Sequence, residues 1–202
     1  MKLKKTALAL SVLLAAGSAA AEFSANIGAT SNYVWRGVTQ TDDSAAITGG
    51  LDYAHDSGFY AGTWASNVDF GDDTNAEVDL YGGFSNEVSG IGYDVGFIYY
   101  GYPGGDDINF LEIQGSLTFG PVTGGVNYIV DSQVDDTSAG NETFIDGDIY
   151  YHVSASFEVA PTWTVGGTVG YFDFKDDGVA GSDTSYTHYQ LDIGKRDRKS
   201  VV

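Results

Sequence analysis

Polar and apolar residues alternate along almost the whole chain, with a period of two residues. In residues 90–102, for example, Ile91, Tyr93, Val95 and Phe97 alternate with glycine and aspartate. Successive side chains of a β-strand point to opposite faces, so this period predicts strands with one apolar and one polar face. No useful window has the spacing of an amphipathic helix. The pattern therefore predicts an all-β protein.

Ten segments have this alternation, and most of them are ten to thirteen residues long. A typical strand of a globular protein has about 5–6 residues, whereas a tilted strand that crosses a bilayer needs about 9–11. The segments lie near 23–38, 44–55, 58–68, 75–87, 90–102, 107–119, 121–131, 148–159, 162–173 and 185–194. Their length favours an antiparallel transmembrane β-barrel.

The connections between these segments alternate in length. Short turns near 56–57, 87–89, 120 and 160–161 alternate with longer, aspartate-rich connections near 39–43, 69–74, 103–106, 132–147 and 174–184. Short turns at one end and long loops at the other are typical of outer-membrane barrels. A secreted β-sandwich is the alternative, but it has no reason to sort its loops in this way.

The two ends of the chain differ from its body. Residues 1–21 have a basic start, an apolar run and a small-residue ending, which together predict a signal peptide and export. The barrel is predicted to occupy residues 22–196. The last six residues, 197–202, can be back-translated into the start of a common sequencing adapter, so we expect a non-native tail there and a barrel that is incomplete at its C-terminus.

The composition excludes several functions. The chain has 28 acidic and 9 Lys or Arg residues, for a net charge of −19, and this argues against a nucleic-acid partner. It has no cysteine, which excludes disulfides and thiolate metal sites. Neither a nucleophile elbow nor a phosphate-binding glycine loop occurs, and the three histidines lack metal-ligand spacing. We therefore expect no enzyme, cofactor or metal, and as partners only outer-membrane lipid and small solutes.

The polar face of the strands is predicted to line the barrel interior. It carries six carboxylates and one arginine, which are the candidate pore-lining residues: Arg36, Asp52, Glu77, Asp79, Asp94, Glu112 and Glu158. Rings of carboxylates favour cations, so we expect cation preference in a conducting barrel. The alternative is a narrow, plugged lumen in which these acids form hydrogen bonds with their neighbours. An unpaired interior arginine is costly, so Arg36 is expected to pair with a carboxylate such as Glu77 or Asp79.

Aromatic residues near the strand ends are expected to form the girdles that outer-membrane barrels place at the two lipid interfaces. The candidates on the proposed lipid face are Tyr33, Trp35, Tyr53, Tyr99, Trp163 and Tyr171.

Four stretches of the chain resemble the TorF family of proteobacterial porins. They are residues 31–41 (SNYVWRGVTQT), 50–53 (GLDY), 58–68 (GFYAGTWASNV) and 77–83 (EVDLYGG). The resemblance covers most of residues 22–194. It implies an outer-membrane barrel of twelve strands, of which about ten are present here, and passive diffusion of small solutes. A non-conducting structural or surface-interaction barrel with acidic extracellular loops is the alternative function.

Overall fold

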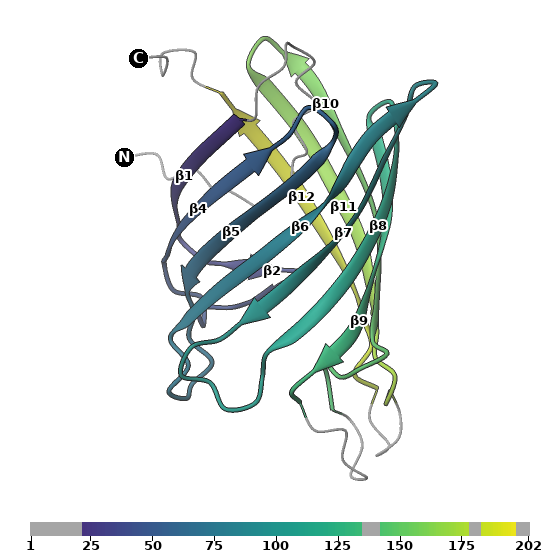
Figure 1. Ribbon diagram of the computed structural model, residues 1–202. Coiled ribbons are helices and arrows are strands. Elements are labelled where there is room, and N and C mark those ends of the chain that lie inside the picture. Colours follow the sequence, from purple (N-terminus) through teal and green to yellow (C-terminus); the bar gives the residue numbers. More distant parts are fainter. Residues whose placement is uncertain (1–21, 135–141, 178–182, 197–202) are drawn as a thin grey trace.

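The computed structural model describes residues 22–134, 142–177 and 183–196. These residues form twelve β-strands and no helix (Figure 1), and every strand pair is antiparallel, so the all-β antiparallel prediction is confirmed. No helix in this part of the chain is long and apolar enough to cross a membrane. The predicted signal peptide (1–21) and the predicted non-native tail (197–202) lie outside the described residues.

Ten of the strands form one meandering sheet in the order β1-β4-β5-β6-β7-β8-β9-β10-β11-β12. Their bounds are β1 Glu22–Thr30, β4 Ala46–Ala54, β5 Phe59–Asn67, β6 Ala76–Val88, β7 Ile91–Gly101, β8 Phe110–Phe119, β9 Val122–Ser132, β10 Ile149–Ala160, β11 Trp163–Asp173 and β12 Tyr186–Lys195. Nine of the ten predicted segments coincide with one strand each. The sheet curls round on itself (Figure 1), but β1 and β12 each pair on one side only, so it is not closed by hydrogen bonds.

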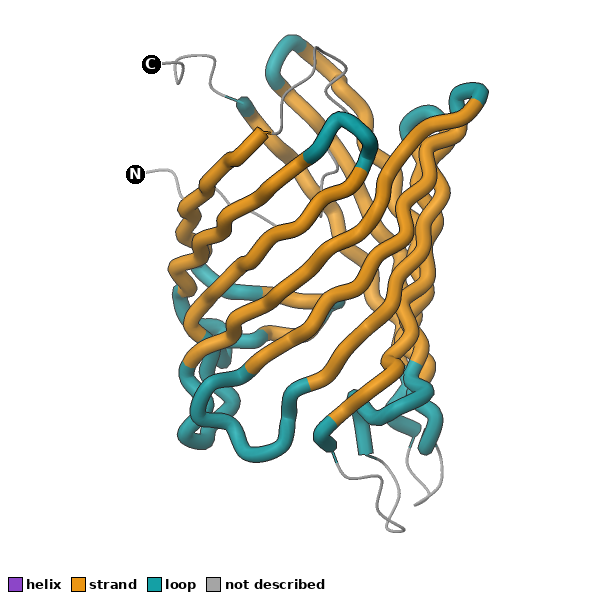
Figure 2. Tube along the Cα trace, in the orientation of Figure 1, coloured by secondary structure: helices purple, strands orange, loops and turns teal. Residues whose placement is uncertain are grey.

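The connections lie at two opposite ends of the sheet, as Figure 2 shows. One end, called here the short-turn end, carries tight turns. For example, Ser89 and Gly90 both have positive φ between β6 and β7, which is the backbone of a type I′ hairpin turn. The other end, called here the long-loop end, carries the connections β5–β6, β7–β8, β9–β10 and β11–β12. The predicted sorting of the loops by length is therefore present in the fold.

The two faces of the sheet differ in chemistry. Large apolar side chains on the outer face are exposed, and Ile27 (85%), Leu117 (62%) and Leu191 (76%) are examples. The buried aromatic and carboxylate side chains, such as Tyr100 and Glu112, lie on the concave face. Soluble monomers rarely expose a continuous apolar surface of this kind. Most large aliphatic residues of the strands therefore face outward, and the core is formed mainly by polar and aromatic residues.

The first predicted strand, 23–38, is wrong beyond residue 30. The chain leaves the sheet after Thr30 and forms a separate hairpin of β2 (Val34–Trp35) and β3 (Val38–Thr39). Its two turn residues, Arg36 and Gly37, have φ of 46° and 88°, which again fits a type I′ turn. Figure 1 shows this hairpin lying inside the curve of the main sheet. We call the segment from residue 31 to 41 the inner hairpin.

Candidate functional site: a hairpin anchored in the interior

The tip of the inner hairpin is fixed by an ion pair. Arg36 donates two hydrogen bonds to Glu112 of β8, with Nη1–Oε1 at 2.6 Å and Nη2–Oε2 at 2.7 Å. Both side chains are buried, at 8% and 1% exposure. Glu112 also accepts hydrogen bonds from Asn127 Nδ2 (3.1 Å) and Tyr100 Oη (3.3 Å). This two-point geometry with additional donors is the arrangement in which a buried ion pair offsets its desolvation.

A β-bulge lies beside this ion pair. The pairing of β8 with β9 shifts between Leu111 and Glu112, so that Glu112 stands opposite Ile129 and Val130 is left over. Bulges commonly re-aim side chains next to functional sites. The register shift lies at the position on β8 from which the Glu112 side chain reaches Arg36 of the inner hairpin.

The guanidinium of Arg36 is charged in this setting. Burial lowers the pKa of Arg36, but the charge of Glu112, with its hydrogen bonds, raises it more, and the net pKa is above the ordinary value. The guanidinium carbon of Arg36 also lies over three aromatic rings. Its distance from the ring centre is 4.3 Å for Trp35, 4.1 Å for Tyr150 and 5.3 Å for Phe172. The cation is therefore held by one carboxylate and by aromatic faces from three different elements.

The last strand holds the backbone of the same turn. Tyr186 Oη donates to the carbonyl of Arg36 at 3.1 Å. A Cβ atom placed on Gly37 would lie 2.6 Å from Cβ of His188, so the turn approaches β12 too closely for any residue but glycine. The hairpin tip thus contacts β8, β10, β11 and β12.

The base of the inner hairpin is attached to the opposite side of the sheet. Tyr33 Oη donates to Glu77 Oε1 of β6 at 3.0 Å, and the Tyr33 ring packs edge-on against Trp64 of β5 at 5.2 Å. Burial raises the pKa of Tyr33 well above its ordinary value, and the nearby charges of Glu77 and Asp79 raise it further. The hydroxyl therefore stays protonated and acts as the donor. The hairpin bridges the interior from β5 and β6 to β12.

Trp35 joins the three buried clusters of the interior. It packs against each of them, although it is itself only partly buried. The cluster members are Tyr33, Ala46, Trp64 and Val68, then Tyr100, Tyr102, Phe110 and Ile129, and finally Tyr150, Phe172 and Phe174. These residues lie toward the long-loop end of their strands or in the loops beyond them. That half of the interior is therefore filled by aromatic side chains and the hairpin.

The half toward the short-turn end is polar and only partly buried. Tyr81 Oη donates to Asp52 Oδ1, and Asn26 Nδ2 donates to Asp52 Oδ2 at 3.4 Å. Tyr60 Oη donates to Asp94 Oδ1 at 3.0 Å. The interior consequently has a packed end and a more open, polar end.

The structure places the predicted lining residues in the interior network, with one exception. Asp52, Glu77, Asp79, Asp94 and Glu112 lie in this network with the anchored Arg36, whereas Glu158, on the same concave face, is exposed near the short-turn end. Arg36 pairs with an interior carboxylate, as expected, but the partner is Glu112 and not Glu77 or Asp79. The type I′ turn carries Arg36 past β6 and across to β8.

Three carboxyl groups of the concave face, Glu77, Asp79 and Asp94, each have one buried oxygen without a hydrogen-bond partner. Glu77 Oε2 and Asp79 Oδ1 are buried and accept no hydrogen bond, although both residues are almost fully enclosed, at 1% and 4% exposure. They lie two positions apart on the same face of β6, so the two carboxyl groups face one region of the interior. Among the described Lys and Arg residues, only Arg36 is buried; Lys175, Lys195 and Arg196 are exposed.

Sequence reasoning missed the inner hairpin and what it contacts. It placed Tyr33 and Trp35 on the lipid face, but both lie inside, because the chain leaves the main sheet after Thr30. It also missed Asn127, Tyr150 and His188 as interior groups. An Arg-Gly pair between Val-Trp and Val-Thr was the available signal, since a residue followed by glycine between apolar residues favours a tight hairpin. The other girdle candidates, Tyr53, Tyr99, Trp163 and Tyr171, are at least partly exposed.

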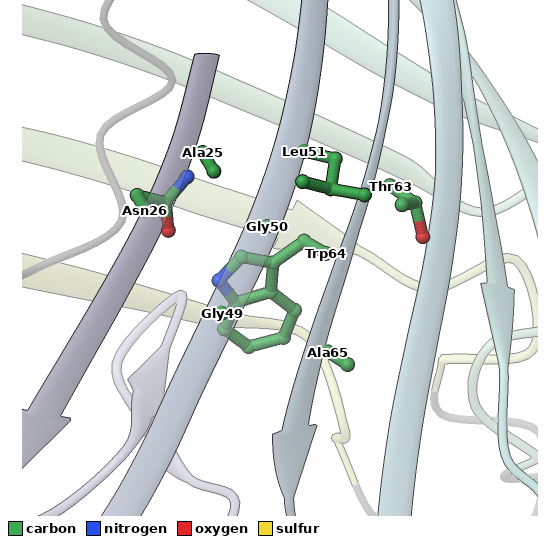
Figure 3. Close-up of a pocket in the computed structure, with 8 residues that line it drawn as sticks. All are labelled: Ala25, Asn26, Gly49, Gly50, Leu51, Thr63, Trp64 and Ala65. Atoms are coloured by element: carbon green, nitrogen blue, oxygen red, sulfur yellow. The ribbon is translucent and has the colours of Figure 1, made fainter.

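A hollow lies between β1, β4 and β5 and shares Trp64 with the buried cluster of Tyr33. Figure 3 shows Trp64 beside Gly49 and Gly50 in this hollow, and the remaining lining is mostly small or apolar. It contains no ionisable side chain. In the described part of the chain, no group of three or more His, Asp or Glu residues could hold a metal ion. The interior network around Arg36 is therefore the site with the richest chemistry.

Comparison with known proteins places the chain in a family. No curated protein and no solved structure matches it. A family model described as a bacterial protein of unknown function, Gcw_chp, matches residues 14–201. The match spans nearly the whole sequence, so the chain belongs to the Gcw_chp family of bacterial proteins.

Proposed function

We propose that this protein is an outer-membrane β-barrel porin for small, preferentially cationic solutes, and that the inner hairpin narrows its lumen. In this proposal the sheet closes in the membrane, the short-turn end faces the periplasm and the long-loop end faces the cell exterior. The chain then belongs with the TorF porins, which it resembles in residues 31–41 and three further stretches.

The separation of the two faces carries this proposal. Exposed apolar side chains cover the outer face of strands that are mostly nine to thirteen residues long, which suits a tilted strand in a bilayer. Without water in the bilayer core, all backbone groups need partners, so the free edges of β1 and β12 must be paired in the membrane, with each other or through the two further strands that the TorF resemblance implies. Lipid is thus the natural environment of the outer face.

The charges of the interior support the cation preference. Asp52, Asp94 and the Glu77–Asp79 pair lie on the concave face, and Glu112 is the only one of the predicted carboxylates that a described arginine neutralises. Interior carboxyl groups that ionise without a neighbouring arginine attract cations and repel anions.

A non-conducting structural barrel is the second candidate. The observation in its favour is the packing of Trp35 against all three buried clusters, which fills the half of the interior toward the long loops. Small barrels are commonly filled by their own side chains.

Planar-bilayer recording separates the two candidates. The purified protein should produce stepwise currents, and in a KCl gradient the reversal potential should have the sign of a cation-selective pore. A stable insertion without current steps would reject the porin function in favour of the structural barrel. Current steps with an anion-selective reversal potential would reject the role of the interior carboxylates.

A further inference from the structure

The pocket around the Arg36 guanidinium is a complete recognition site for a cation. Glu112 supplies both oxygens, at 2.6 and 2.7 Å from the two Nη atoms. Tyr150 and Phe172 supply aromatic faces at 4.1 and 5.3 Å from the guanidinium carbon. A bidentate carboxylate together with aromatic faces is the combination that recognises guanidinium and alkylammonium groups. We call the set of Glu112, Tyr150, Phe172 and Trp35 the aromatic cage.

Most of the aromatic cage does not depend on the hairpin. Glu112, Tyr150 and Phe172 belong to β8, β10 and β11, and only Trp35 comes from the hairpin itself. Asn127 of β9 and Tyr100 of β7 hold the carboxylate of Glu112 from the side, so its orientation is fixed by the main sheet. The main sheet would therefore keep the carboxylate and two of the three aromatic faces in place without the Arg36 side chain.

We propose that the aromatic cage is a binding site for a solute with a guanidinium or alkylammonium group, and that Arg36 occupies it as an internal ligand. The proposal deepens the proposed porin function and rests on it, because it names the class of cation that the lumen selects. A tethered group competes at high effective concentration, so an external cation displaces Arg36 only when it is abundant or binds through further contacts. Removing the Arg36 side chain removes this competition.

The test uses Arg36→Ala protein refolded in detergent micelles, with methylguanidinium chloride as the probe. At roughly ten times its dissociation constant, the probe should raise the Tm of Arg36→Ala by about 4 °C. The concentration stays in the millimolar range, and sodium chloride of equal ionic strength controls for screening. Arg36→Met is the matched variant, because its side chain fills the cage without a charge. Methylguanidinium should not raise the Tm of the wild type or of Arg36→Met.

Three results would overturn the proposal. The first is that methylguanidinium leaves the Tm of Arg36→Ala unchanged, and the second is that it raises the Tm of the wild type or of Arg36→Met equally. The third is that sodium chloride raises the Tm of Arg36→Ala by the same amount. Where Arg36→Ala does not refold alone, the refolded fraction is measured with methylguanidinium present. Recovery with this probe and not with sodium chloride supports the cage, and no recovery overturns it. The Tm measurement needs no current, so the two proposals can fail separately. A rise in Tm without channel steps in the bilayer supports the aromatic cage and rejects the pore. Channel steps without a rise in Tm support the pore and reject the aromatic cage.

Discussion

Replacing Val153 by arginine should destabilise the membrane-inserted protein by about 2–4 kcal/mol, whereas Val159→Arg should cost only about 0–1 kcal/mol. Val153 lies in the middle of β10 and Val159 lies near its short-turn end, both on the outer face. In a bilayer the first arginine would sit near the midplane and the second near the interface. The free energy of unfolding in lipid vesicles, measured by urea titration with tryptophan fluorescence, gives both values.

Each of the two variants, Val153→Arg and Val159→Arg, is the control for the other in the unfolding measurement. Val153 is 56% exposed and Val159 is 59% exposed, so a protein whose outer face meets water would tolerate both substitutions almost equally. Exposed substitutions of that kind usually change stability by less than about 0.5 kcal/mol. Equal and small losses for the two variants would contradict a lipid-facing outer surface.

Replacing Glu112 by alanine should destabilise the protein by about 3–5 kcal/mol, because it leaves the buried Arg36 cation without its partner. The loss would also remove the acceptor for Asn127 and Tyr100. Unfolding by urea in detergent micelles measures the effect. The double variant Arg36→Met with Glu112→Leu should recover most of the lost stability, since apolar residues of similar size often replace a buried ion pair at little cost.

Glu158→Ala is the matched control for this substitution. Glu158 is a carboxylate on the concave face of the neighbouring part of the sheet, but it is exposed, so its removal should change the free energy of unfolding by less than about 0.5 kcal/mol. If Glu112→Ala and Glu158→Ala lowered the free energy of unfolding by the same amount, this result would contradict the role of the ion pair in anchoring the hairpin.

The strands of the main sheet were predictable because their signal is local. A period of two over ten or more residues identifies a strand and assigns each residue to a face, so Glu77, Asp79, Asp94 and Glu112 could be placed in the interior from the sequence. The alternation of short and long connections predicted the meandering order. The pattern did not predict the end of β1 at Thr30, because the polar and apolar residues continue to alternate for a few positions after the chain turns inward.

The partners across the interior were not predictable, because they depend on distances that no local pattern contains. Arg36 and Glu112 are 76 residues apart, and their contact requires both the type I′ turn of the hairpin and the register of β8 with β9. Sequence reasoning could infer that a lone interior arginine needs a carboxylate. It chose Glu77 or Asp79 because nothing in the pattern ranked the available acids by distance.

The most direct test of the central claim is whether the protein inserts into lipid as a closed barrel. The protein, refolded into phospholipid vesicles, should resist extraction with urea and should migrate differently on SDS gels before and after boiling, as compact barrels do. A protein that stays in the aqueous phase, or whose migration is the same before and after boiling, would contradict the account.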